Sequence, residues 1–338
     1  MSATTAIPDY YAALEINPRA SSEIVHAAYR VLAAAHAQDA DDAKLRLITE
    51  AKGVLYDEYS RAEYDRKRTN KTGVCVGNYR LIKEIAEGGF GRTYKGEHLL
   101  TKGAVCIKQC CKISPEDDQV LIEEALAMWD LRHFSIPSVK DIIRGDDGGL
   151  YLIMSWMEGM HIEKIVETIG AIPVEHVSWI VERILNPLMY IHERLIIHGD
   201  IKPQNVLVMH KEHMAGIVDF GLSMINPTAK DQAKGYTQYF APPEQIARKP
   251  LLPQSDFYSL GVLIIYMLCG GNTRDVSNLN IPSSTPKPFK DFVYSLVRRD
   301  VMARPDWNKG QFYRDYQQMR QDVFGRSHTN FEPIPGLA

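Results

Sequence analysis

The order of seven short motifs constrains this chain more than any other feature of its sequence. The most informative is the block His198–Asn205 (HGDIKPQN), which places an aspartate, a lysine and an asparagine within a few residues of one another. Asp219-Phe220-Gly221 follows it, directly after the apolar stretch Gly216–Val218. Each motif alone has a plain structural explanation: Asp256 fits a helix N-cap, and Arg304 fits a solvated charge. The order and spacing of the whole set make coincidence a poor explanation.

The composition is that of an ordinary globular protein. Of 338 residues, 45% are hydrophobic and 24% are charged, which excludes a chain disordered along its length. Lys and Arg number 39 against 42 Asp and Glu, a net charge of −3, so we expect neither nucleic acid nor a membrane surface as a partner. The five cysteines include no C-x-x-C pair, and the N-terminus lacks a signal-peptide pattern. Reduced thiols and a cytoplasmic location are therefore predicted.

A change in sequence character near residue 70 predicts two domains. Residues 8–68 have the apolar spacing of consecutive helices, and the polar segment 69–77 that follows predicts a linker. Short strand-like runs then surround a glycine cluster, whereas helices dominate further along the chain. The apolar run Leu260–Cys269 is too short to cross a membrane and predicts a buried helix. A β-rich part before a larger α-rich part predicts two lobes over 78–310, followed by a C-terminal helix and tail over 311–338.

From Asn78 onward the sequence resembles the eukaryotic-type (Hanks-type) serine/threonine protein kinases. The resemblance implies an α+β fold with a β-rich small lobe and an α-rich large lobe, and transfer of the γ-phosphate of ATP to hydroxyls of a protein substrate. It also implies Mg²⁺ as a cofactor. Lysine two positions after Asp200 is the serine/threonine pattern rather than the tyrosine pattern. The alternative is a pseudokinase, a scaffold that binds partners without catalysis.

The resemblance assigns residues 86–93 to a glycine-rich loop over the nucleotide. Glycines let backbone amides close over phosphate oxygens without a Cβ in the way. Two positions depart from the family pattern, since Ala86 replaces the first glycine and Thr93 replaces a valine. The residues implied to contact ATP are Ile85, Ala86, Glu87, Gly88, Gly89, Phe90, Gly91, Thr93, Cys106, Lys108, Ser155, Met157 and Leu207.

The rest of the small-lobe site follows from Val105–Lys108, which matches the third-strand motif of the family. Lys108 is implied to pair with the α- and β-phosphates, and Cys106 replaces the small alanine that roofs the adenine. Glu124 is implied to form an ion pair with Lys108. Glu123 competes for that role, but the distance from Glu124 to His133 fits the pattern better.

The catalytic loop, residues 198–205, carries the implied chemistry of the large lobe. Asp200 would orient the substrate hydroxyl and accept its proton, and Lys202 would neutralise the phosphate in transfer. Asn205 and Asp219 would bind magnesium, because a hard cation favours oxygen ligands. Glu244 is expected to pair with Arg304.

Gly199 is the main departure in the large lobe, because the family has an arginine there. That arginine docks a phosphorylated residue of the activation segment, which here is residues 219–244. Thr228, Tyr236 and Thr237 are candidate phosphorylation sites, although Thr237 fits the substrate-docking stretch better. Without the arginine, we expect phosphorylation of the segment to matter less.

Residues 8–68 resemble a J-domain, through Asp9–Leu14, Ala28–Leu32 and Arg61–Arg66. A J-domain stimulates its heat-shock chaperone through a His-Pro-Asp loop and a basic second helix. Here the aligned loop is Ala37-Gln38-Asp39, and the second helix carries one arginine and no lysine. An adaptor or regulatory module with a partner protein is therefore expected, with residual co-chaperone activity as the alternative.

Overall fold

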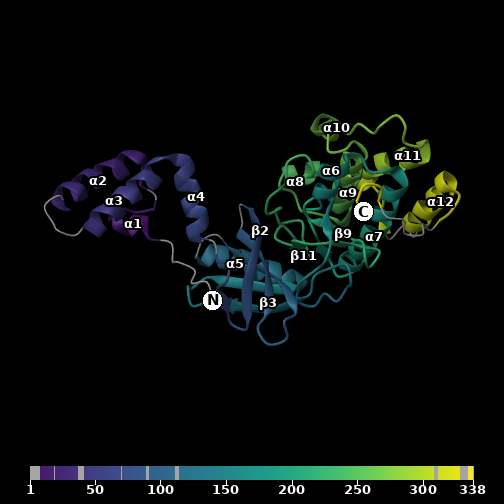
Figure 1. Ribbon diagram of the computed structural model, residues 1–338. Helices are drawn as coiled ribbons and strands as arrows, with labels where there is room; N and C mark the ends of the chain where they lie inside the picture. The colour runs from purple at the N-terminus through teal and green to yellow at the C-terminus, as the bar shows by residue number, and fades with distance from the viewer. Residues whose placement is uncertain are drawn as a thin grey trace. The chain divides into compact units, whose positions relative to one another are not determined.

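The computed structural model of the chain describes residues 8–18, 20–36, 42–69, 71–88, 91–110, 114–307, 311–327 and 334–337. Contacts divide the chain into two compact units, residues 1–74 and 75–338 (Figure 1). Each unit has its own hydrophobic core. None of the helices in the described ranges is both long enough and apolar enough to cross a membrane.

The first unit is helical. Its helices are α1 (Tyr10–Ala13), α2 (Ser22–His36), α3 (Asp42–Tyr56) and α4 (Glu58–Thr69). Asp9 begins α1, since its side chain accepts hydrogen bonds from the backbone N–H groups of Tyr11 and Ala12. α2 and α3 lie side by side (Figure 1), and α1 and α4 also pack on α3. Apolar and tyrosine side chains from all four helices fill the core, among them Tyr10, Val25, Ile48, Leu55 and Tyr64.

The second unit begins with a six-stranded antiparallel sheet in the order β1-β2-β3-β4-β6-β5. Its strands are β1 (Cys75–Val76), β2 (Tyr79–Gly88), β3 (Gly91–His98), β4 (Ala104–Cys110), β5 (Val139–Arg144) and β6 (Leu150–Ser155). Helix α5 (Pro115–Met128) packs against β4, β5 and β6. Ser114 caps α5 by accepting from Asp117 N, and proline at the first helical position supports the same start.

One part of the predicted linker over 69–77 belongs to this sheet. Val76 in β1 pairs with Tyr79 in β2 and is 3% exposed. Gly77 makes the tight turn between the two strands in the left-handed region, with a φ of 53°. The linker prediction rests on the polar residues 69–72, whereas Val74, Cys75 and Val76 are apolar and Val76 is buried in the sheet.

The rest of the second unit is mainly helical. Its helices are α6 (Ile162–Ile169), α7 (Val174–His192), α8 (Pro243–Ile246), α9 (Pro253–Leu268), α10 (Thr273–Ser277), α11 (Lys287–Leu296), the 3₁₀ helix Val301–Ala303 and α12 (Phe312–Phe324). Two small sheets join them: β10 (Met214–Ile217), β9 (Val206–Met209) and β7 (Met160–His161), and β11 (Met224–Ile225) with β8 (Ile196–Ile197).

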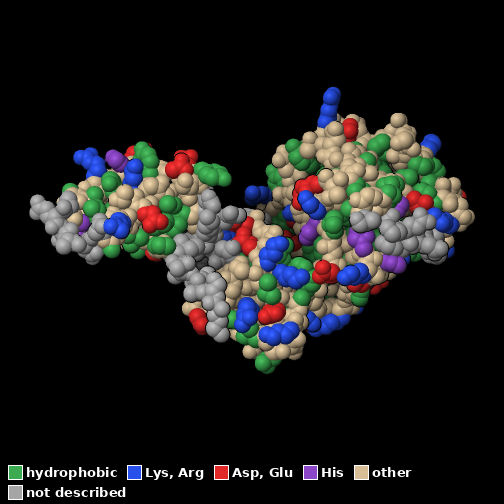
Figure 2. Space-filling view, in the orientation of Figure 1, with side chains coloured by type: hydrophobic (Ala, Val, Ile, Leu, Met, Phe, Trp, Pro, Cys, Tyr) green, Lys and Arg blue, Asp and Glu red, His purple; other side chains and the backbone are tan. Residues whose placement is uncertain are grey.

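A β-rich lobe followed by an α-rich lobe agrees with the predicted α+β, two-lobed fold (Figure 1). The predicted buried helix is confirmed, because Leu260, Val262 and Ile264 of α9 are fully buried on different sides of that helix. Near the C-terminus, the side chain of Ile334 is buried in the core of the large lobe, with 1% of its surface exposed. Basic and acidic side chains are interspersed over the face seen in Figure 2.

Candidate active site

Lys108 in β4 lies at the centre of a group of three charged side chains. Its Nζ is 2.6 Å from Oε2 of Glu124 in α5 and 2.8 Å from Oδ1 of Asp219. Strand alternation sends Ile107 into the sheet core and Lys108 to the opposite face. Helical spacing puts Glu124 on the buried face of α5 with Leu121. Three segments distant in the sequence therefore meet at one ammonium group.

Lys108, Glu124 and Asp219 shift one another's pKa values. Burial acts to raise the pKa of Asp219, but the attraction of Lys108 outweighs burial and lowers that pKa to about 2. Burial raises the pKa of Glu124, and Lys108 opposes that rise. Burial acts to lower the pKa of Lys108, yet the two carboxylates raise it overall. The lysine is therefore cationic, and Asp219 is ionised near neutral pH.

Asp200 in the catalytic loop is held through both carboxylate oxygens. Thr237 donates its hydroxyl to Oδ1 at 2.6 Å, and the Lys202 ammonium lies 2.7 Å from Oδ2. Asn205 donates from Nδ2 to Oδ2 and to the Asp200 carbonyl oxygen, each at 2.9 Å. This network fixes the orientation of the carboxylate. Thr237, expected in the substrate-docking stretch, also contacts Asp200 directly.

Asp256 positions the backbone of the catalytic loop. Its Oδ2 accepts from His198 N and its Oδ1 from Gly199 N, both at 2.8 Å, and His192 Nε2 lies 2.8 Å from Oδ2. Burial acts to raise the pKa of Asp256, but the hydrogen bond from His192 and its other partners lower it overall. A buried carboxylate at the start of α9 thus orders the residues before Asp200.

Glu244 and Arg304 form a buried pair, as the resemblance predicts. The guanidinium donates to both carboxylate oxygens, at 2.6 and 2.9 Å, and Ser255 donates to Glu244 Oε1 at 2.8 Å. A bidentate pair of this kind is strong and geometrically specific. It ties the end of the activation segment to the large lobe.

The glycine-rich loop joins β2 to β3. Ala86 is the cross-strand partner of Thr93, and Gly88 is the partner of Gly91. Gly89 and Phe90 lie outside the described residues. A Cβ on Gly91 would stand 2.1 Å from Gln109 O. Backbone packing on β4 therefore requires glycine at this position.

The remaining residues predicted to contact the nucleotide lie on both lobes. Cys106 in β4 is paired with Met154 in β6, Ser155 ends β6, and Leu207 lies in β9. Met157 follows β6, and its methyl group lies against Gly216 in β10, where a Cβ would come within 2.4 Å. These residues, unlike Gly89 and Phe90, all belong to the described part of the fold.

Asn205 and Asp219 supply oxygens suited to a hard divalent cation. Because Asn205 Nδ2 donates to Asp200, its Oδ1 is the acceptor atom of that amide. Within the described ranges, no group of three or more His, Cys, Asp or Glu side chains is arranged to hold a metal by itself. Mg²⁺ typically takes one or two carboxylates together with phosphate oxygens, and these residues fit that pattern.

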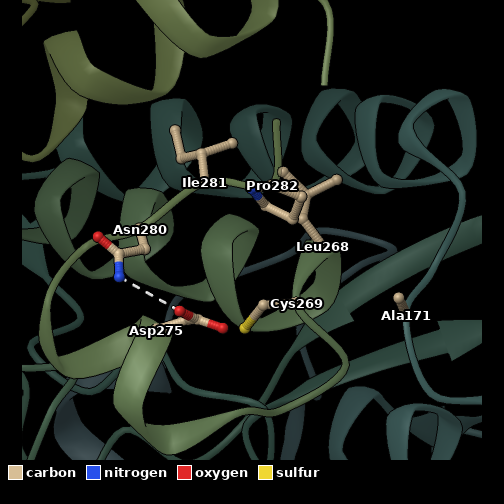
Figure 3. A pocket seen from close by; sticks show the side chains of 7 residues that line it. All are labelled: Ala171, Leu268, Cys269, Asp275, Asn280, Ile281 and Pro282. Carbon is tan, nitrogen blue, oxygen red and sulfur yellow. Dashed lines mark hydrogen bonds between the residues drawn. The ribbon is translucent and has the colours of Figure 1, made fainter. Parts of the chain in front are cut away.

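A separate pocket of about 300 Å³ lies where α9 ends and α10 begins. Figure 3 shows its seven lining residues: Ala171, Leu268, Cys269, Asp275, Asn280, Ile281 and Pro282. Asn280 donates from Nδ2 to Asp275 Oδ1 at 3.2 Å. None of the seven is among the predicted site residues.

Comparison with known proteins gives a family for this chain. The family model described as protein kinase domain matches residues 79–311. The chain is similar to the serine/threonine-protein kinase atg1 of Dictyostelium discoideum, with 29% identity over 255 residues covering 69% of this chain and 38% of that protein. It is also similar to the probable serine/threonine-protein kinase PknB of Lactococcus lactis, with 27% identity over 275 residues covering 74% and 42%.

A third relative is the serine/threonine-protein kinase PknA of Nostoc sp., with 30% identity over 218 residues covering 59% of this chain and 38% of that protein. The chain spans about two fifths of the length of these relatives. The family model covers more than half of the chain and includes Lys108, Glu124, Asp200 and Asp219. The chain therefore belongs to the protein kinase family.

Proposed function

We propose that this chain is an active serine/threonine protein kinase that uses ATP and Mg²⁺. The observation that carries the proposal is the Lys108 group, in which one ammonium contacts both Glu124 and Asp219. In protein kinases both the lysine–glutamate pair and the aspartate that binds Mg²⁺ must be in place for catalysis. The relatives named as serine/threonine kinases, and Lys202 two positions after Asp200, support the substrate class.

In the proposed reaction, the oxygen of a serine or threonine hydroxyl forms a bond to the γ-phosphorus of ATP. The bond from that phosphorus to the bridging oxygen breaks, so that ADP leaves, and the hydroxyl proton passes to the Asp200 carboxylate. Lys202 offsets charge on the transferred group, and Lys108 holds the nucleotide phosphates. Asp219 and Asn205 would hold Mg²⁺, which neutralises phosphate charge when bound.

A phosphotransferase assay on the purified full chain tests this proposal. Labelled ATP, Mg²⁺ and a generic serine/threonine substrate are incubated with the wild type, with Asp200→Asn and with Lys108→Met. We expect product from the wild type alone, with both variants folded by circular dichroism. Equal background signal from all three proteins would contradict the proposed kinase activity and would favour the pseudokinase scaffold.

For the first unit we propose a J-like adaptor module. Its support is the packing of two of the three segments that carry the resemblance, since Tyr64 accepts from Tyr10 N and donates to Pro8 O, each at 2.8 Å. On α2, Ile24 and Val31 are exposed, at 52% and 69%, where a J-domain has a basic face. Ala37-Gln38-Asp39 lies outside the described residues.

The ATPase rate of a J-domain-dependent heat-shock chaperone distinguishes an adaptor from a co-chaperone. The full chain should leave that rate unchanged. Stimulation abolished by Asp39→Asn would contradict the adaptor proposal and restore co-chaperone activity. The cytoplasmic location stays a prediction based on cysteine usage.

A further inference from the structure

Gln245 connects the catalytic loop to the activation segment through one side-chain nitrogen. Its Nε2 donates to Gly199 O at 2.7 Å and to Gly235 O at 2.8 Å. Gly199 directly precedes Asp200, and Gly235 lies two residues before Thr237, the donor to Asp200. The Gln245 side chain is buried, at 2% exposed. Both hydrogens of its amide are therefore used to join two backbones that meet at Asp200.

There is no room for a side chain on residue 199. Its φ is 73°, in the left-handed region, and a Cβ there would lie 2.8 Å from Leu222 O and 3.1 Å from Leu251 Cδ1. Leu251 belongs to a buried apolar cluster with Ile197, Met224 and Ala233. Ala233 comes from the activation segment itself. The segment is thus packed by apolar burial next to Gly199.

A second link runs from the activation segment to α5. Lys234 Nζ lies 2.8 Å from Oε2 of Glu123, the residue next to Glu124. The hydrogen bond from Lys234 lowers the pKa of Glu123, so this carboxylate is ionised at neutral pH. The two side chains are 34% and 39% exposed, so the pair is partly solvated. It connects the segment to the helix that carries the Lys108 partner.

We infer that Gln245 is a positioning residue for Asp200, and that the activation segment is anchored without a phosphate by Gln245, the apolar cluster around Ala233 and the Lys234–Glu123 pair. The effect of Gln245 on catalysis rests on the proposed kinase function. The anchoring of the activation segment does not. Gln245 supplies two neutral hydrogen bonds from one buried side-chain nitrogen.

Hydrogen exchange and kinetics of full-length Gln245→Ala and Gln245→Glu test the positioning role. Glutamate nearly matches glutamine in size, but its carboxylate cannot donate, so both variants should lose the bridge. We expect faster amide exchange in residues 226–241 and a kcat at least tenfold lower, with the KM for ATP within twofold because Lys108 and Asp219 are untouched. Gln232→Ala, an exposed position in the same segment, serves as the matched control.

Wild-type exchange and kcat in both Gln245 variants would overturn the positioning role. If the wild-type chain shows no catalysis, the proposed function fails while the exchange data still decide the anchoring. A second measurement compares phosphatase-treated chain, shown by mass spectrometry to carry no phosphate, with untreated chain. Unchanged exchange and kcat are expected, and a tenfold fall in kcat or loss of protection would show that a phosphate does anchor the segment.

Discussion

Trp307 donates its indole N–H to Nδ1 of His192 at 2.8 Å, a contact between residues 115 positions apart. Because an indole nitrogen can only donate, Nδ1 must accept, and the histidine hydrogen in the neutral ring lies on Nε2. That nitrogen faces Asp256, which also accepts from His198 N. An aromatic residue near the end of the second unit therefore fixes the tautomer of a histidine that supports the catalytic loop.

Trp307→Phe should weaken this support while keeping an aromatic ring against Phe257, whose centroid lies 4.9 Å away. Losing one buried hydrogen bond and leaving its acceptor unpaired costs about 1–3 kcal/mol. We expect a lower midpoint of thermal unfolding and a kcat reduced several-fold with unchanged KM for ATP. Trp129→Phe, at a position 47% exposed, is the control. Equal melting temperatures for the wild type and the Trp307 variant would show that the hydrogen bond from Trp307 to His192 does not support the catalytic loop.

Gly199 and Gly325 offer a comparison, because both have a positive φ, 73° and 69°. Gly325, after α12, is in the left-handed region, where alanine costs about 1–2 kcal/mol. At Gly325 a Cβ meets nothing within 4 Å, whereas at Gly199 it would meet Leu222 O at 2.8 Å. Gly199→Ala should therefore destabilise the chain more than Gly325→Ala, as measured by denaturant unfolding. Equal losses of unfolding free energy in the two variants would show that the catalytic loop shifts to make room for the Cβ at no cost in stability.

The arginine of the family should likewise fail to restore phosphate control here. In Gly199→Arg the new side chain starts from the same crowded Cβ, next to the cluster that contains Leu251. Reduced activity and stability are expected, with no gain on phosphorylation of the segment. A variant activated by phosphorylation would show that the apolar cluster yields to a charged side chain.

The local parts of the site follow from the sequence, and the long-range parts do not. The resemblance to the kinase family implies Lys108 and Glu124 as partners, and the structure places them 2.6 Å apart. The choice of Glu124 over Glu123 agrees with the structure, where Glu123 contacts Lys234. Strand and helix periodicity agrees with the pairing of Lys108 with Glu124, because the direction of each side chain is fixed by its own strand or helix.

Thr237 and Gln245 illustrate what such patterns miss. Thr237 reaches Asp200 across 37 residues, and Gln245 reaches Gly199 across 46. Both contacts depend on the path of the activation segment, which contains little regular structure. The family resemblance predicts Gly91 as a phosphate-binding glycine, but its lack of a Cβ is also required by Gln109 on the neighbouring strand. Such requirements arise only once strands are paired.

The acid stability of the chain should depend on Asp219. Lys108 lowers its pKa from the ordinary 3.8 to about 2 in the folded state. The unfolded chain then binds more protons between these values, so the contribution of Asp219 is present above about pH 4 and is lost as pH falls toward 2. In the wild type, the urea concentration at the unfolding midpoint should fall as the pH is lowered from about 4 to about 2. In Asp219→Asn that fall should be smaller. Parallel curves for both proteins would place the acid sensitivity elsewhere.

The Lys234–Glu123 pair should show coupling in a double-mutant cycle. Lys234→Glu and Glu123→Lys each place like charges together, and their combination restores an opposite pair. For a partly exposed pair we expect a coupling of about 0.2–1 kcal/mol in unfolding free energy, smaller at high salt. If the double variant is no more stable or active than the sum of the single changes, the two side chains do not interact.

Cys106 should report nucleotide binding directly. It lies two residues before Lys108 in β4, and burial raises the pKa of its thiol to about 12. Alkylation should therefore be slow, and saturating ATP with Mg²⁺ should slow it further by covering the strand face that carries Cys106. Cys75 is exposed and serves as the internal control, with a rate that does not respond to ATP. Cys106→Ala should be tolerated, because it supplies the small side chain of the family. Mass spectrometry showing equal Cys106 modification with and without ATP, while binding is confirmed independently, would place the adenine elsewhere than above β4.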